Sequence, residues 1–290
     1  SWEDYNPKLI SKGGGVYKRS SKSISLTQPV QKLLNTTRSA MPPNDLINAL
    51  LKTQADLLWI GGIGTYVKGE SETHADAGDK ANDTLRINGA ELNVRVVGEG
   101  GNLGCSQLAR IEFAKAGGRI NTDAVDNSAG VNCSDNEVNI KILLNRLVDQ
   151  KKLNQSQRDA LLAEMTDDVA QMVLRNNYYQ AQALSLDEAN SHSHFDSFTR
   201  LTHYLVNSVQ LNREIEYLPD NDELKTRSIN KQGLTRPELA VLMAYSKMDV
   251  NNSLLEQEPE LLNKDSYSKG WIIKIKFQMK RLKKLFQFLT

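Results

Sequence analysis

A glycine cluster behind an apolar run is the first feature of the sequence that could do chemistry. The run VRVV (94–97) is followed by the turn-like GEGGNLG (98–104) and then by the helix-like CSQLARIEFAKAGG (105–118). A strand, a glycine turn and a helix in this order can hold a pyrophosphate at the helix N terminus. Asp123 follows about twenty residues later, where such a fold places its ribose-binding carboxylate. One hypothesis is therefore that residues 94–126 form the first βαβ unit of a dinucleotide site.

Three details count against a pyrophosphate cradle. Leu103 occupies the position where the strict G-x-G-x-x-G fingerprint has its third glycine. Glu99 lies inside the turn, where a carboxylate would face an anionic diphosphate. Another strand and glycine turn, LLWIGGIG (57–64), comes earlier in the chain, so the strand at 94–97 would not be the first of its sheet. A tight turn without a ligand is the simpler alternative.

A third interpretation joins three turns that are rich in glycine or asparagine. They are Gly61-Gly62, Gly100-Gly101-Asn102 and Asn127-Ser-Ala-Gly130. We expect them to lie side by side at the carboxyl ends of adjacent strands, where open α/β sheets bind ligands. Small residues let a backbone approach a ribose or a nicotinamide ring, and asparagine amides can bond to ribose hydroxyls and to a carboxamide.

The elements that would position these turns are those of an α/β sheet followed by helices. Short, mainly apolar runs at 55–60 and 94–97 alternate with helical segments, which favours a parallel sheet. Further helices are predicted at 28–34 and 45–51. From about residue 136 the apolar residues have helical spacing without intervening strands. Ser156, with Asp159 three residues on, is the predicted cap of the second long helix, and Thr235 that of a later one.

Three regions follow from this pattern. Residues 1–145 are predicted to form a partial Rossmann-like domain with an N-terminal wrapping segment, and residues 146–264 a helical domain. Residues 265–290 form a basic, aromatic tail unlike the rest of the chain. This tail has two interpretations. It is either an amphipathic helix that binds a membrane or an acidic partner, or an accidental sequence such as a shifted reading frame.

The composition limits the classes of function. The chain has 36 Lys and Arg residues against 35 Asp and Glu, so its charge gives no case for a nucleic-acid partner. The two cysteines have no metal-like spacing and fit a reducing, cytoplasmic setting. No run of about 18 apolar residues indicates a transmembrane helix, and we expect no membrane partner for the chain as a whole.

The other candidate residues have simpler interpretations. His74 lies among Glu72, Asp76 and Asp79, which invites a metal or acid–base role, yet the spacing matches no closed zinc pattern and loop ordering is expected. No metal site is predicted. Cys105, at the expected helix start, and Cys133 are interpreted as packing residues.

Long motifs identify a family likeness. The segment from Asp56 to about Leu144 closely resembles the large-subunit, NAD-dependent glutamate dehydrogenases of bacteria. The motifs are GGIGTYVK (61–68), ETHADAGDKAND (72–83), VVGEGGNLG (96–104), GGRINTDAVDNSAGVNCSDNEVNIKILL (117–144) and LTRPELAVLMAYSK (234–247). The resemblance covers roughly residues 1–250 and is not expected to reach 265–290.

The resemblance implies a cofactor, a substrate and their contacts. NAD would lie close to Gly61, Gly62, Gly100 and Gly101. The nicotinamide ribose would contact Asn102. The binding roles of two further residues are also implied, namely Asn127 beside nicotinamide and substrate, and Ser134 at the distal carboxylate of the substrate.

The implied activity is oxidative deamination of L-glutamate to 2-oxoglutarate and ammonia, as part of amino-acid catabolism in a cytoplasmic homo-oligomer. The family's catalytic Lys and Asp match no stretch of this sequence, so no catalytic residue is assigned. The chain, which begins with Ser1 rather than Met, is therefore expected to be a C-terminal fragment that is inactive alone. A non-catalytic assembly module with a binding tail is the alternative.

Overall fold

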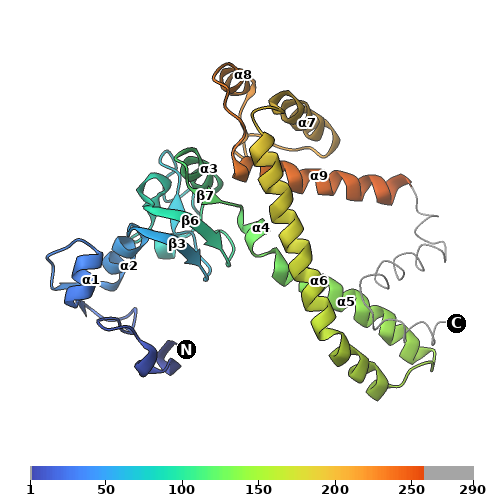
Figure 1. The fold of residues 1–290 in the computed structure, drawn as a ribbon, viewed down its shortest axis with the longest axis horizontal. Helices are drawn as coiled ribbons and strands as arrows, with labels where there is room; N and C mark the ends of the chain where they lie inside the picture. The colour runs from blue at the N-terminus through green and yellow to red at the C-terminus, as the bar shows by residue number, and fades with distance from the viewer. Residues whose placement is uncertain (1, 258–290) are drawn as a thin grey trace. The chain divides into compact units, whose positions relative to one another are not determined.

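The computed structural model describes residues 2–257, which fall into two compact units. The first unit comprises residues up to 123 together with 235–238, and the second comprises 124–234 and the residues after 238. The predicted class, α/β followed by all-α, is confirmed (Figure 1). The tail at 265–290, for which two interpretations were open, lies outside the described residues.

A three-stranded parallel sheet organises the first unit. Its strands, in spatial order, are β3 (Ala55–Ile60), β6 (Val94–Glu99) and β7 (Arg119–Ile120). The strand predicted from the run Ala55–Ile60 is confirmed with the same bounds, and the one predicted at 94–97 is confirmed and extends two residues further, to Glu99. Helix α3 (Gln107–Lys115) connects β6 to β7. Ser106 caps this helix by accepting the N–H of Ala109 at 3.2 Å, so the helix begins after Cys105 and not at it.

Smaller elements surround the sheet. They are β1 (Ile24–Ser25), α1 (Gln28–Leu33), β2 (Ala40–Met41), α2 (Pro43–Leu51), β4 (Val67–Lys68) and β5 (Ile87–Asn88), with short 3-10 helices at Trp2–Asp4, Pro7–Leu9, Lys80–Asn82 and Gly89–Glu91. The helices predicted at 28–34 and 45–51 are confirmed. The N-terminal segment has a small cluster of its own, in which Ile24, Leu26 and Met41 pack with Leu46 of α2.

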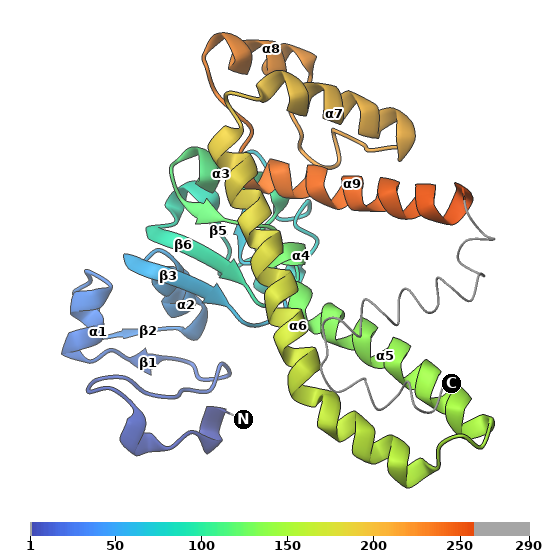
Figure 2. The ribbon, with the colours of Figure 1, turned by 45° about the vertical axis from the view of Figure 1, so that its right-hand side comes forward.

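The main core of the first unit lies on one face of the sheet. Leu58 and Ile60 of β3 and Val97 of β6 point to this face, and they pack with Leu51 of α2 and Phe113 of α3. Figure 2 shows β3 and β6 side by side with α2 next to β3. Alternate residues of a strand point to opposite faces, so the neighbours of these core residues in sequence face away from α2 and α3.

The second unit is helical. Its helices are α4 (Asp123–Asp126, whose first residue belongs to the first unit), α5 (Ser128–Asp149), α6 (Gln155–Asn190), α7 (Phe195–Ser208), α8 (Asn221–Ile229) and α9 (Arg236–Gln257, whose residues up to 238 belong to the first unit). Helices α5 and α6 pair around Leu144, Leu147 and Met165. A second cluster, which includes Leu184 and Leu205, joins α6, α7, α8 and α9. The domain boundary expected near residue 145 lies within α5.

The predicted cap of α6 was wrong. Asn154, and not Ser156, caps this helix: its Oδ1 accepts the Gln157 N–H at 2.8 Å, while Gln157 Oε1 accepts the Asn154 N–H at 3.0 Å. A capping box needs a side chain at the third helical position that reaches back to the cap, and a glutamine does this as well as an acidic residue. The helix therefore starts two residues earlier than the Ser156-Asp159 pattern indicated.

Candidate functional site

Two glycine turns of the first unit lie against each other. Gly61-Gly62 follows β3 and Gly100-Gly101 follows β6, and β3 and β6 are neighbouring parallel strands. The Gly101 N–H donates to the carbonyl of Ile60 at 3.0 Å. A Cβ on Gly101 would lie 2.5 Å from the carbonyl oxygen of Gly62, so only glycine allows this approach of two backbones. The expected adjacency of these two turns is confirmed, and their contact with a cofactor stays a prediction.

Asn102 lies exposed at the tip of the second turn, just before two anchored backbone groups. The N–H of Leu103 donates to Asp123 Oδ2 at 2.8 Å, and the N–H of Cys105 donates to Glu99 Oε1 at 2.9 Å. Leu103 has a φ of 58°, a left-handed conformation that a leucine adopts only where its surroundings impose it. The turn that carries Asn102 is thus fixed by two carboxylates.

One arginine holds both carboxylates. Arg110 of α3 donates through Nε to Glu99 Oε2 at 2.7 Å and through Nη2 to Glu99 Oε1 at 2.9 Å, and Nη2 lies 3.3 Å from Asp123 Oδ1. The side chains of Glu99 and Arg110 are 0% and 6% exposed. Burial opposes the charge of Arg110, but its hydrogen bonds to Glu99 and its attraction to the charges of Glu99 and Asp123 together outweigh this and raise the pKa of the guanidinium. We call Arg110, Glu99 and Asp123 the Arg110 clamp.

The contacts of the Arg110 clamp correct two expectations of the hypothesis that residues 94–126 form the first βαβ unit of a dinucleotide site. Glu99 does not face a ligand, because the alternation along β6 turns it to the covered face with Val97, where it meets Arg110. The carboxylate of Asp123 binds the Leu103 N–H and Arg110 and is held within the protein, which argues against its role as a ribose-binding acid. No sequence signal indicates the role of Arg110, since a glutamate and an arginine eleven residues apart form no recognisable motif.

The third predicted turn is not a turn at a strand end. Ser128, Ala129 and Gly130 are the first residues of α5, α4 stands between them and β7, and Asn127 is the N-cap. The local hydrogen bonds of Ser128 explain this helix start. Its Oγ donates to the carbonyl of Val125 at 2.8 Å and accepts from Gln180 Nε2 of α6 at 3.1 Å. The beginning of α5 is therefore fixed to α6 within the second unit.

Ser134 lies on α5, with an exposed side chain. Seven residues separate it from Asn127, which is about two helical turns, so the two residues lie on the same side of α5, roughly 10 Å apart along its axis. Five of the seven predicted binding residues thus come together at one end of the first unit's sheet, namely the four glycines and Asn102. Asn127 and Ser134 belong to the second unit.

The His74 segment orders its own loop. His74 Nδ1 lies 2.8 Å from Arg86 Nη1, and because an arginine only donates, the imidazole nitrogen accepts. Asp79 Oδ2 accepts from Asn82 Nδ2 at 2.6 Å and from the Thr65 N–H at 2.8 Å, and these hydrogen bonds lower the pKa of Asp79. Within residues 2–257, no three His, Cys, Asp or Glu side chains gather as metal ligands. The predicted loop-ordering role is consistent with these contacts.

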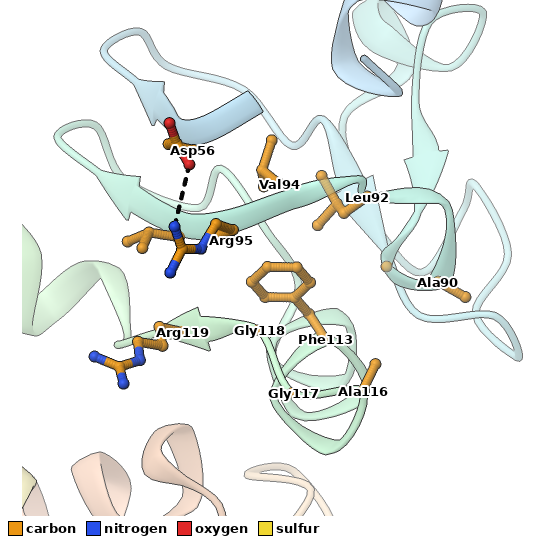
Figure 3. Close-up of a pocket in the computed structure, with 12 residues that line it drawn as sticks. Asp56, Ala90, Leu92, Val94, Arg95, Phe113, Ala116, Gly117, Gly118 and Arg119 are labelled. Atoms are coloured by element: carbon orange, nitrogen blue, oxygen red, sulfur yellow. Dashed lines mark hydrogen bonds and ion pairs between the residues drawn. The ribbon is translucent and has the colours of Figure 1, made fainter. Parts of the chain in front are cut away.

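A hollow of about 650 Å³ opens at the other end of the sheet (Figure 3). Arg95 and Arg119 lie at its rim, and Phe113 of α3 reaches into it beneath β6. Arg95 lies 3.4 Å from Asp56 in an exposed ion pair. Ligands of open α/β sheets bind beyond the carboxyl ends of the strands. This hollow lies at the opposite end, where β6 begins, so we assign no ligand to it.

Models of two protein families match the chain. A model of the family described as bacterial NAD-glutamate dehydrogenase, catalytic domain, matches residues 1–187, and one described as glutamate dehydrogenase, C-terminal, matches residues 231–274. The second match enters the tail, further than the sequence motifs indicated. No helix among residues 2–257 is long and apolar enough to span a bilayer.

Three relatives are NAD-specific glutamate dehydrogenases. The protein from Pseudomonas aeruginosa is 53% identical over 256 residues, which cover 88% of this chain. The proteins from Halomonas elongata and Mycobacterium tuberculosis are 50% and 48% identical over 258 and 264 residues, each covering 89% of this chain. The chain spans 16% of the length of each of these relatives.

Proposed function

Because the chain belongs to the bacterial NAD-glutamate dehydrogenase family, we propose that it contributes the nicotinamide end of an NAD site to an enzyme that oxidises L-glutamate. The reaction converts L-glutamate, NAD⁺ and water to 2-oxoglutarate, ammonium, NADH and a proton. NAD⁺ supplies the acceptor for the hydride that leaves Cα of glutamate, and water hydrolyses the resulting imine. The Lys and Asp that move protons in this family are not assigned to any residue of the chain.

The two glycine turns fit the cofactor. A Cβ on Gly62 would have no neighbour within 4 Å, so the space beside this backbone is open. The adjoining Gly101 packs against Gly62 and keeps the two turns in contact. A surface of bare backbone, with the exposed amide of Asn102 at its tip, suits a ribose and a carboxamide, which need close approach and paired donors and acceptors.

Each proposed residue has one task. Gly61, Gly62, Gly100 and Gly101 let the backbone approach the cofactor. Asn102 bonds to the nicotinamide ribose. The two residues of the second unit also contact the substrate. Asn127 lies beside nicotinamide and glutamate, and the hydroxyl of Ser134 donates to the distal carboxylate of glutamate.

The observation that carries the proposal is the pair of apposed glycine turns with Asn102 fixed by the Arg110 clamp. The test is a chimera in which residues 1–257 of this chain replace the matched segment of the Pseudomonas aeruginosa relative. We expect glutamate-dependent NADH formation from the chimera and none from the 290-residue chain alone. NADH formation by the isolated chain would contradict the proposed division of the site.

We also propose a cytoplasmic homo-oligomer. Both cysteines are free thiols, which suits a reducing compartment. Leu174 and Tyr178, one turn apart on α6, expose 62% and 64% of their surface and form an apolar strip suited to a subunit contact. Sedimentation of the full-length chimera tests the assembly, and a monomer would refute it.

A further inference from the structure

Three polar side chains form a continuous line from α9 through α6 to the beginning of α5. The ammonium of Lys247 donates to Gln180 Oε1, and Gln180 Nε2 donates to the hydroxyl of Ser128 at 3.1 Å. The Ser128 hydroxyl in turn donates to the carbonyl of Val125 at 2.8 Å. All of these residues belong to the second unit. We call Lys247, Gln180 and Ser128 the Lys247 relay.

The relay ends where Asn127 lies. The hydrogen bond from Ser128 to Val125 closes the turn that contains Asn127, between α4 and α5. A second hydrogen bond of this junction runs from the Gly130 N–H to the carbonyl of Asn127 at 3.2 Å. The backbone position of Asn127 therefore depends on where the Ser128 hydroxyl directs its proton.

Lys247 fixes the direction of each hydrogen bond in the relay. An ammonium has three donors and no acceptor, so the oxygen of the Gln180 amide must face it. The nitrogen of that amide then faces Ser128, whose oxygen must accept. A hydroxyl has a single proton. In Ser128 this proton is left for the two acceptors beside it, which are the carbonyl of Val125 and Asn177 Oδ1.

Lys247 carries its charge in surroundings that oppose it. Much of the side chain is exposed, but desolvation by the neighbouring protein lowers the pKa of its ammonium. Its partner is the neutral amide of Gln180, and within residues 2–257 no carboxylate forms an ion pair with it. Desolvated charges without a counter-ion reduce stability and are concentrated at functional sites. This cost favours a functional role of the ammonium over simple packing.

We propose that Lys247 is a positioning residue for glutamate oxidation, which acts through the relay to hold Asn127 in place beside nicotinamide and substrate. Its effect passes through Gln180 and needs no contact with either ligand. The inference rests on the proposed function for the task of Asn127, whereas the relay rests on its own hydrogen bonds.

Loss of the ammonium lets the Gln180 amide turn over. Its oxygen can then face Ser128 and draw the hydroxyl proton away from Val125. The turn that contains Asn127 loses its closing hydrogen bond, while the apolar residues that pack α6 against α9 stay in place.

Steady-state kinetics of the chimera with the Pseudomonas aeruginosa relative test the relay. Lys247→Met should lower kcat/KM for glutamate about fivefold, the effect of one lost hydrogen bond. Lys247→Arg, which also only donates, should restore kcat/KM to within about twofold of the parent. Gln180→Glu keeps a partner for Lys247 but can only accept from Ser128, so it should resemble Lys247→Met. Lys225→Met, which removes an exposed lysine of α8, is the matched control and should behave like the parent.

A double variant distinguishes a relay from independent contacts. Gln180→Leu breaks the line at its middle, so the addition of Lys247→Met should lower kcat/KM no further. A further fall of about fivefold in the double variant would overturn the proposal. Equal losses in Lys247→Arg and Lys247→Met would contradict it as well, since they would indicate packing rather than the direction of a hydrogen bond.

Amide hydrogen exchange of the 290-residue chain tests the relay independently of activity. The Gly130 N–H, which donates to the Asn127 carbonyl, should exchange about fivefold faster in Lys247→Met and at the parent's rate in Lys247→Arg. The amide of Leu205, in the core of the same unit, should not change. Unchanged exchange at Gly130, or equal acceleration at Leu205, would refute the relay. Glutamate-dependent NADH formation by the unmodified chimera reports separately on the proposed function, so the two ideas fail independently.

Discussion

Replacing Arg110 by methionine tests whether the clamp fixes the Asn102 turn. The substitution keeps the apolar stem but removes four donor contacts, two to Glu99, one to Asp123 and one to Gln107. The Glu99 carboxylate, 0% exposed, would remain buried without the guanidinium. Breaking a buried pair from one side costs about 3–5 kcal/mol, and we expect a loss of this size in the free energy of unfolding of the first unit.

A double variant separates the contribution of the Arg110–Glu99 ion pair from that of the hydrogen bond between Glu99 and the Cys105 N–H. In Arg110→Met, Glu99→Met both charges are gone, and apolar replacement of a whole buried pair is often near neutral. The N–H of Cys105 then loses its acceptor, which costs roughly 1–3 kcal/mol. The double variant should therefore be more stable than Arg110→Met alone. Arg95→Met, which breaks only the exposed pair with Asp56, is the matched control and should unfold like the parent.

Guanidinium chloride unfolding gives the stabilities, and amide exchange gives their location. Because the chain has two units, a single transition is not assumed, and exchange at Leu103 and Cys105 reports the first unit directly. Both amides should exchange faster in Arg110→Met. A cost below about 1 kcal/mol, or a double variant less stable than the single one, would refute the assignment of Arg110 as the residue that holds the turn.

Three further predictions follow from local geometry. Gly101→Ala should cost about 1–3 kcal/mol by overpacking against Gly62, whereas Gly62→Ala, with open space for its Cβ, should unfold like the parent in denaturant; equal costs would count against the contact between the turns. Burial raises the pKa of Glu112, so the charge of this carboxylate disfavours folding above that pKa. Glu112→Gln should therefore raise the free energy of unfolding at pH 7, and the difference from the parent should vanish below about pH 4.3. A difference in unfolding free energy between variant and parent that does not change with pH would refute this prediction. A thiol reagent should modify exposed Cys133 at once and buried Cys105 only on unfolding, and rapid loss of both thiols would show that the segment around Cys105 opens.

The local signals that predicted the sheet were strong. The apolar runs at 57–60 and 94–97 end in glycine turns, and parallel pairing brings such ends together. The need for glycine at 101 could be suspected from sequence, but its partner could not. Only the structure shows that the Gly62 carbonyl lies where a side chain at 101 would begin.

Long-range polar pairing escaped prediction. The sequence places Glu99 inside the glycine turn, where its carboxylate would face a diphosphate, but the strand continues through Glu99 and turns it towards Arg110. The Asn127 segment was read as a turn because asparagine, serine and glycine favour turns in isolation. Its hydrogen bonds to α6, through Gln180, give it a helical conformation instead. In both cases the deciding partner lies elsewhere in the chain.

The central claim is that Asn102, at the tip of the apposed turns, contacts the nicotinamide end of NAD. The most direct measurement is steady-state kinetics of the chimera with Asn102→Ala at varied NAD⁺ and saturating glutamate. Loss of one or two hydrogen bonds of about 1 kcal/mol each predicts a fall in kcat/KM for NAD⁺ of about tenfold, and denaturant unfolding of the same variant separates this loss from any change in stability. Unchanged kinetics towards NAD⁺ would contradict the account.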